Sequence, residues 1–338
     1  MKKTILAVLA LASVVACNKS EVLEVAPQKA ISFENPFINN STKSEDPSWS
    51  ADNMFTSFKV YGTLTNTATV TDATQATSTN IFAGIPVTEN EGVWSYDEQY
   101  NQYWISGNTY NFAAVVANDA NATTVSNVAG KTIGMPVSLS YNAKTQDDVL
   151  YAKSEEIVSD GDDSHVNFTF NHLLSKVKFN FTNTYTIDGY TVKVSNIQIL
   201  NPYKTATVTF PNTWSAQAIA DDFALNFGNA DVKADGASDT NALIPNNNST
   251  YSSTYERLLI PGTQELNIAF DVEVYQGSFL TDKYSYTSTN PVEVDVTLQP
   301  GYCYNFNAEI GKELKLITFD VKGINAWTPN DGQNVTVQ

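Results

Sequence analysis

Positive charge, histidine and cysteine are all scarce in this 338-residue chain. The 19 lysines and arginines, with Arg257 the single arginine, stand against 36 aspartates and glutamates, and the net charge is −17. Nucleic-acid binding needs clustered basic side chains, so this balance excludes a nucleic-acid partner. The sequence also lacks the HExxH, GxSxG, phosphate-loop and zinc-ligand spacings of common catalytic and metal sites. We therefore expect a protein that is not an enzyme and has no cofactor or metal site.

Helix-forming residues are scarce as well. Leu, Glu, Lys and Arg are few, whereas Thr, Asn, Ser, Val, Tyr and Phe dominate the sequence. This bias is typical of strands and turns and not of helices. The length suits two modules of about 150 residues, each large enough to bury a core of its own. The composition predicts an all-β protein.

Long hydrophobic runs are lacking outside residues 1–17. Two lysines precede the apolar residues 5–12, a run too short to span a bilayer, and the segment ends in the sequence VVAC at Ala16 and Cys17. This is the pattern of a bacterial lipoprotein signal, with cleavage between Ala16 and Cys17 and lipid attachment at Cys17. Each buried CH₂ of an acyl chain adds about 0.8 kcal/mol, so we expect a stable lipid anchor. Cys303 is then the sole remaining thiol, and no internal disulfide can form.

The clearest strand signal is the sequence VNFTFNHLLSKVKFNF at residues 166–181. Apolar and polar residues alternate in both halves, but the parity of the apolar positions changes between Phe170 and Val177. A change of parity turns the buried face over, which predicts two strands joined by a bulge or corner. The acidic turn sequence SDGDDS at residues 159–164 comes just before, and it predicts a domain boundary there.

Strict alternation continues in the second half of the chain. Apolar residues occupy every second position in 266–274, 292–298 and 302–310, and a change of parity within 192–199 predicts a bulge. Residues 216–227 alone have weak helical character. Short strands separated by regular turn signals predict antiparallel β-sandwiches.

Structural roles explain the residues that could otherwise act in catalysis or metal binding. We expect His172, between the two strands of 166–181, to be packed or hydrogen-bonded and not catalytic. Cys303 has no paired base in the sequence, so we expect an inert thiol. The aspartates at 160, 162 and 163 resemble a calcium loop, but no bidentate glutamate follows at the required spacing, which favours a solvated turn. Carboxylate pairs of a glycosidase remain an open alternative, although no pair is singled out by the sequence.

Several short motifs, taken in their order along the chain, resemble the Bacteroidales fimbrillins, the group that includes the major and minor fimbrium subunits. The resemblance covers nearly the whole length. Its motifs are the lipobox at Cys17; Ile31-Ser32-Phe33 ahead of a basic residue; Phe58-Lys-Val60-Tyr61; the spacing from Tyr103-Trp104 to Tyr110-Asn-Phe112; Asp148-Val-Leu150-Tyr151-Ala152; Phe170-Asn-His172-Leu-Leu-Ser175-Lys176-Val177; Pro300-Gly301-Tyr302; and Ile324-Asn325-Ala326-Trp327.

The resemblance implies a fold of two tandem transthyretin-like antiparallel β-sandwiches. It also implies export as a lipoprotein to the outer membrane, exposure at the cell surface, and a role as structural subunit of a fimbrium that supports adhesion. Subunits of this family lose an N-terminal strand by proteolysis and polymerise when a neighbour's strand fills the vacated place. The implied partners are copies of this chain or sister fimbrial subunits, joined by strand addition.

Two segments fit the roles that strand exchange requires. Ile31, Ser32 and Phe33 form a brief apolar alternation followed by the loop 39–47, so this strand could be removed without unfolding the rest. Removal leaves unpaired backbone groups beside apolar side chains, and a donated strand repairs both. The alternating residues Val335, Thr336 and Val337, within 333–338, are the candidate donor strand. They favour a position in the stalk of the fibre.

Lys43 is the candidate maturation site, with Ser44 as the new N-terminus, because it is the basic residue in the loop after that strand. The best-known family members are cut after arginine, and no arginine precedes Arg257. Either a lysine-tolerant protease acts, or the strand is retained and the subunit anchors or ends a fibre. The predicted organisation is a signal at 1–17, a tether and removable strand at 18–44, one sandwich at 45–163 and a second at 164–338.

A glycan-binding surface lipoprotein is the alternative function. Sugars stack on exposed aromatic rings, and the sequence has two aromatic clusters that could provide them. These are Tyr96, Tyr100, Tyr103 and Trp104, and Tyr251, Tyr255, Tyr284 and Tyr286. Packing in the core or on a sheet face is the commoner role of such residues.

Overall fold

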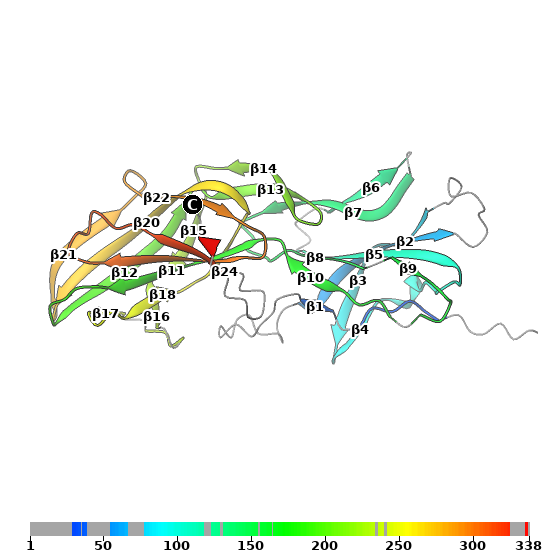
Figure 1. Ribbon diagram of the computed structural model, residues 1–338, viewed down its shortest axis with the longest axis horizontal. Helices are drawn as coiled ribbons and strands as arrows, with labels where there is room; N and C mark the ends of the chain where they lie inside the picture. Colours follow the sequence, from blue (N-terminus) through cyan, green and yellow to red (C-terminus); the bar gives the residue numbers. More distant parts are fainter. Residues whose placement is uncertain are drawn as a thin grey trace, which may run out of the picture.

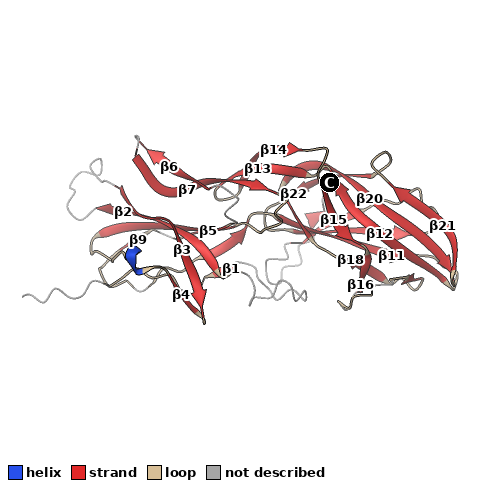
Figure 2. Ribbon diagram, turned by 180° about the vertical axis from the view of Figure 1, so that it is seen from behind, coloured by secondary structure: helices blue, strands red, loops and turns tan. Residues whose placement is uncertain are grey.

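The computed structural model describes residues 29–34, 36–38, 55–66, 78–117, 123–128, 131–154, 156–163, 165–233, 236–239, 242–324 and 335–336. Within these ranges the protein is all-β, as the composition predicts, and the helical content is one 3₁₀ turn, Glu98–Tyr100. Figure 2 shows this turn as the single blue element among red strands. Strand pairing is antiparallel except between β1 and β10 and between β11 and β23.

The first sheet occupies one end of an elongated molecule (Figure 1). It contains eight strands: in spatial order β1 (Phe37–Ile38), β10 (Thr169–His172), β8 (Leu150–Lys153), β5 (Asn108–Val116), β2 (Ser57–Asn66), β3 (Ser78–Asn90) and β4 (Val93–Ser95), with β9 (Ile157–Val158) beside β5.

Two sheets form a sandwich at the other end. One contains β16 (Ala230–Lys233), β18 (Thr250–Ser253), β11 (Ser175–Asn183), β23 (Cys303–Ile310), β24 (Asp320–Ile324) and β25 (Val335–Thr336), with β19 (Arg257–Leu259) beside β11. The other contains β15 (Ala224–Gly228), β12 (Tyr190–Leu200), β20 (Gly262–Gln276) and β21 (Phe279–Tyr286), with β17 (Ile244–Pro245) beside β12 and β22 (Val292–Leu298) beside β20.

A fourth sheet is shared by the two ends. It has the order β14 (Thr213–Ile219), β13 (Tyr203–Thr209), β7 (Lys131–Asn142) and β6 (Thr123–Val128). Its central pair joins β7, from the first half of the chain, to β13, from the second half, with Thr207 opposite Ser140. In both views this sheet runs along one side of the molecule and spans the two ends (Figures 1 and 2).

Both faces of the first sheet are buried. Successive side chains of a strand point to opposite sides, so the two faces pack into different cores. Val60, Phe112 and Ala114 face a core that also contains the N-terminal residues Ile31 and Phe33. Their neighbours Tyr61, Ala113 and Val115 face β7 and belong to the larger core of the second half. The first sheet therefore lies between Ile31 and Phe33 on one side and the shared sheet on the other.

The chain passes from one core to the other within residues 166–181. Val166, Phe168 and Phe170 pack in the first core, whereas Val177, Phe179 and Phe181 pack in the second. The predicted pair of strands is confirmed as β10 and β11, and the change of parity is the corner between them. Because β10 pairs with β8, the first core includes Phe170, and the second core begins at Leu173 and Leu174. The domain boundary at 163/164 stays a prediction.

Local patterns explain most of the second half. The predicted bulge lies in β12, where pairing with β20 shifts between Ser195 and Gln198 and Asn196 adopts φ 56°. The weak helical character of 216–227 does not produce a helix: residues 216–219 belong to β14 and residues 224–227 to β15. Pairing with β13 provides β14 with backbone hydrogen bonds, whereas a short isolated helix is only marginally stable.

Polar contacts fix the junction between the two cores. The Gln146 side chain donates to the Leu258 carbonyl (3.0 Å) and accepts from the Leu258 N–H (2.9 Å). Trp214 Nε1 donates to the Leu173 carbonyl (2.8 Å). His172, with its side chain 3% exposed, pairs through Nδ1 with the Asp148 carboxylate. This position fits the structural role expected of His172.

Candidate functional site

The N-terminal strand segment, which we define as the described residues of 29–38, lies between two other parts of the chain. On one side the Ile31 N–H donates to the Gln102 carbonyl (2.8 Å), and the Trp104 N–H donates to the Lys29 carbonyl (3.0 Å). On the other side the Val166 N–H donates to the Ser32 carbonyl (2.8 Å). The segment continues into β1, which runs parallel to β10. It is thus hydrogen-bonded along both edges.

The side chains of this segment alternate as the sequence predicts. Ile31, Phe33 and Ile38 are each 1% exposed, whereas Ser32 is half-buried and Glu34 is exposed. Full burial of one such side chain contributes about 1.5–3 kcal/mol. The candidate removable strand, Ile31, Ser32 and Phe33, is therefore an integral part of the first core.

Phe33 lies at the centre of an aromatic cluster. Its ring stacks on Phe168, with a centroid distance of 5.7 Å and an interplanar angle of 12°. The rings of Phe82 (5.4 Å) and Phe112 (5.8 Å) meet it edge to face. Tyr96 (5.9 Å) and Phe58 (6.5 Å) complete the set. We call these five rings the Phe33 site.

Tyr96 contacts the N-terminal strand segment through both its hydroxyl and its ring. Its hydroxyl donates to the Ile31 carbonyl at 2.6 Å, while its ring belongs to the Phe33 site. Burial raises the pKa of Tyr96 above its ordinary value of 10.0, so the hydroxyl stays protonated and remains a donor at neutral pH. The sequence places Tyr96 in an aromatic cluster but gives no sign of this contact.

Two side-chain contacts of the segment, at Lys29 and at Glu34, lie at the surface. Lys29 Nζ lies 3.6 Å from an Asp162 oxygen, and His165 Nδ1 lies 3.3 Å from a Glu34 oxygen. Exposed pairs of this kind contribute about 0–1 kcal/mol. The segment is consequently held by its apolar side chains and backbone bonds and only weakly by charge.

The candidate donor strand lies in the other sandwich. Val335 pairs with Gly323 and Thr336 with Lys322, which makes β25 the strand beside β24 at the end of its sheet. Val337, the third residue of the candidate donor, is outside the described residues, as are Ala16, Cys17, Lys43 and Ser44. Lys43 belongs to the interval 39–54 that follows β1.

In each aromatic cluster considered for glycan binding, two of the four rings are buried or engaged within the fold. Trp104 is 1% exposed and Tyr96 holds the N-terminal segment, which leaves Tyr100 (38%) and Tyr103 (42%) at the surface. In the second cluster, Tyr251 and Tyr286 are 8% and 7% exposed and lie in different sheets. Each cluster therefore has at most two rings available for stacking on a sugar.

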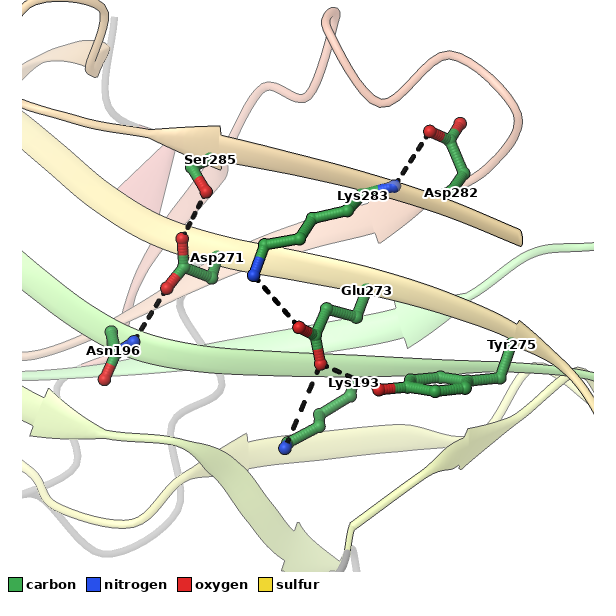
Figure 3. Close-up of polar contacts among 8 residues, drawn as sticks. All are labelled: Lys193, Asn196, Asp271, Glu273, Tyr275, Asp282, Lys283 and Ser285. Atoms are coloured by element: carbon green, nitrogen blue, oxygen red, sulfur yellow. Dashed lines mark hydrogen bonds and ion pairs between the residues drawn. The ribbon is translucent and has the colours of Figure 1, made fainter. Parts of the chain in front are cut away.

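A charged network covers the outer face of β12, β20 and β21 (Figure 3). Glu273 lies 3.0 Å from Lys283 and 4.0 Å from Lys193, and it accepts from the Tyr275 hydroxyl at 2.9 Å. The hydrogen bond from Lys283 is the main cause that lowers the pKa of Glu273, followed by the bond from Tyr275.

Asp271 extends this network towards β12. Burial raises the pKa of Asp271, but hydrogen bonds from Ser285 and from Asn196 (2.7 Å) outweigh it, and the net pKa is lowered. These residues face one another directly across neighbouring strands, as Asp271 and Ser285 do, or Glu273 and Lys283. Cross-strand polar pairs of this kind stabilise a sheet.

The described residues lack two further features. No helix there is both long and apolar enough to cross a membrane. In the same ranges no three His, Cys, Asp or Glu side chains are grouped so that they could hold a metal ion. At the acidic turn, the Asp162 N–H donates to Asp160 (2.8 Å) and Ser159 donates to Asp163.

Residues 42–327 match the family model described as fimbrillin-like. A fimbrial protein from Bacteroides vulgatus has a similar structure, with a TM-score of 0.56 and 15% identity over 89% of this chain and 100% of that one. A candidate cell adhesion protein from Bacteroides ovatus gives 0.49 and 14% over 88% and 96%.

The fimbrial anchor protein Mfa2 from Porphyromonas gingivalis gives a TM-score of 0.38 and 9% identity over 92% and 100% of the two chains. A search of curated proteins gave no match. The family match spans most of the sequence, and the fold agrees with that of the Bacteroides vulgatus protein. The chain therefore belongs to the fimbrillin-like family.

Proposed function

We propose that this protein is a structural subunit of a surface fimbrium, exported as a lipoprotein and joined to its neighbours by strand exchange. The observation that carries the proposal is the placement of Ile31, Phe33 and Ile38 in the first core, on a segment hydrogen-bonded along both edges. A segment in this position fills a site that another extended strand can fill in the same way.

The order of the segments along the chain supports removal of this strand. The buried segment ends at Ile38, and Lys43 follows five residues later, before β2 begins at Ser57. A cut after Lys43 separates the strand covalently from the sandwich that it completes. Its loss exposes the Phe33 site and the backbone groups of Gln102, Trp104 and Val166, which a donated strand would cover again.

The remaining parts of the proposal follow the sequence. Lipid attachment at Cys17, after cleavage behind Ala16, brings the chain to the outer membrane and retains it there until the cut releases it. The two cores correspond to two tandem sandwiches of the transthyretin-like kind, which meet near Leu173. The tail at 333–338 is the segment that this subunit donates.

Variants at two lysines test the maturation step in cells. Lys43→Gln removes the candidate cut site, whereas Lys19→Gln, upstream of the strand, is the matched control. We expect the unchanged protein to form heat-sensitive, high-mass complexes in unheated gel samples, Lys43→Gln to abolish them, and Lys19→Gln to leave them intact. Unchanged complexes in the Lys43→Gln strain would reject cleavage at this lysine as the step that licenses assembly.

A further inference from the structure

The Phe33 site specifies an aromatic side chain. Phe33 is 1% exposed, stacks flat on Phe168 and is met edge to face by Phe82 and Phe112. Both arrangements are the preferred geometries of aromatic pairs, and they depend on the flat ring of the residue at the centre. An aliphatic side chain at position 33 loses the stacked contact and leaves part of the site empty.

The position two residues before it specifies an apolar side chain on an extended backbone. Ile31 is 1% exposed, and both of its backbone groups are hydrogen-bonded, the N–H to the Gln102 carbonyl and the carbonyl to the Tyr96 hydroxyl. A strand that replaces the N-terminal segment must therefore present an apolar residue and an aromatic residue two positions apart. Side chains at this spacing point to the same face of a strand.

The candidate donor of this chain does not meet that requirement. In the sequence QNVTVQ at 333–338, Val335 and Val337 have the correct spacing, but both are valines. In either strand direction a valine falls where Phe33 lies. A slip of one residue brings Asn334, Thr336 or Gln338 into the core instead, which is worse because buried polar groups without partners are costly.

We infer that the strand site of this subunit accepts an extended segment of the pattern apolar-x-aromatic from a sister subunit, and not the tail of another copy of this chain. The inference rests on the proposed strand exchange and specifies its partner. The fibre is then built from unlike subunits around this position.

Peptide binding to the cleaved protein tests this inference. A recognition sequence for a specific protease replaces residues 41–47 of the full chain, and the cut protein is offered labelled peptides. The peptides are residues 29–38, the same peptide with Phe33→Val, the tail 333–338, and tails with Val335→Phe, Val337→Phe or Thr336→Phe. The last substitution is the matched control, since it adds the same ring on the opposite face of the strand.

Truncation of a buried phenylalanine costs enough to weaken binding about 100-fold or more. We expect the 29–38 peptide to bind and its Phe33→Val form and the native tail to bind about 100-fold more weakly. Val335→Phe or Val337→Phe, according to the strand direction, should strengthen tail binding at least tenfold, and Thr336→Phe should not.

Two results would overturn the inference, and they can be told apart. If the native tail binds as tightly as the 29–38 peptide, or if neither valine substitution strengthens it, the aromatic requirement is wrong while strand exchange stands. If no peptide binds, including 29–38 itself, the cut protein does not exchange strands, and the proposed function falls together with the inference.

Discussion

Replacing Phe33 by alanine should destabilise the first core strongly. The side chain is 1% exposed and contacts five aromatic rings at centroid distances between 5.4 and 6.5 Å. Loss of a buried phenylalanine costs about 3–5 kcal/mol. Phe58, Phe82 and Phe112 of the Phe33 site lie on paired strands of the first sheet. Their rings therefore cannot fill the space left by Phe33 unless those strands move. We therefore expect a loss in the upper half of that range.

Urea unfolding measures this loss, with tryptophan fluorescence as the signal. Trp104 is buried in the first core and Trp94 packs against it, so they report on that region. Phe279→Ala is the matched control because Phe279 is 77% exposed, and we expect it to change the free energy of unfolding by no more than about 0.5 kcal/mol. A loss below about 1 kcal/mol for Phe33→Ala would refute the reasoning, because such a value is typical of a side chain that is not packed.

Three further predictions concern other parts of the fold. Gln146→Ala should cost about 1–3 kcal/mol in urea unfolding, because it leaves the Leu258 N–H and carbonyl without their partner at the junction of the cores. Gly62→Ala should lower the melting temperature, since a Cβ there would lie 2.8 Å from the Phe112 ring, and overpacking costs about 1–3 kcal/mol; an unchanged melting temperature would contradict the packing of this face. Glu273→Gln should cost less than about 1 kcal/mol at pH 7, as its partners are exposed. The pKa of Glu273 is lowered from 4.5, so its stabilisation is present above pH 4.5 and is lost as the pH falls through the folded-state pKa; the difference from wild type should therefore shrink below pH 4.5, and a constant difference in melting temperature would argue against the ion pair.

The sequence predicts strands well where burial has a period of two. In β20, residues 266–274 alternate strictly, and the structure buries Leu266, Ile268, Phe270, Val272 and Val274. The change of parity in 166–181 likewise predicts the corner between β10 and β11. Such patterns are local, and they record which face of a strand is covered.

Features that depend on distant residues could not be predicted in the same way. The parallel pairing of β11 with β23 joins segments more than a hundred residues apart, and no local pattern identifies the partner. Residues 216–227 gave a misleading helical pattern, because their strand state depends on pairing with β13 and β12. Turn-forming residues predict a boundary at the acidic turn, but the sequence does not indicate that the core of the first sheet includes Phe170.

At the candidate site, the sequence predicts the strand but not its contacts. Alternation predicts the strand at Ile31 and Phe33, and the resemblance supplies its role, but the sequence does not indicate that Tyr96 holds the Ile31 carbonyl. Nor does it indicate that Phe33 stacks on Phe168, since these residues are separated by most of the first domain. The aromatic requirement at position 33 emerges only from the packing.

The mature N-terminus tests the central claim most directly. Protein recovered from the native cell surface is analysed by intact mass and terminal sequencing, alongside heated and unheated gel samples. The account predicts a chain that begins at Ser44 and runs unheated as a ladder of heat-sensitive complexes. A chain that begins at acylated Cys17 and is found only as a monomer would contradict it, because the strand would then still fill its own site.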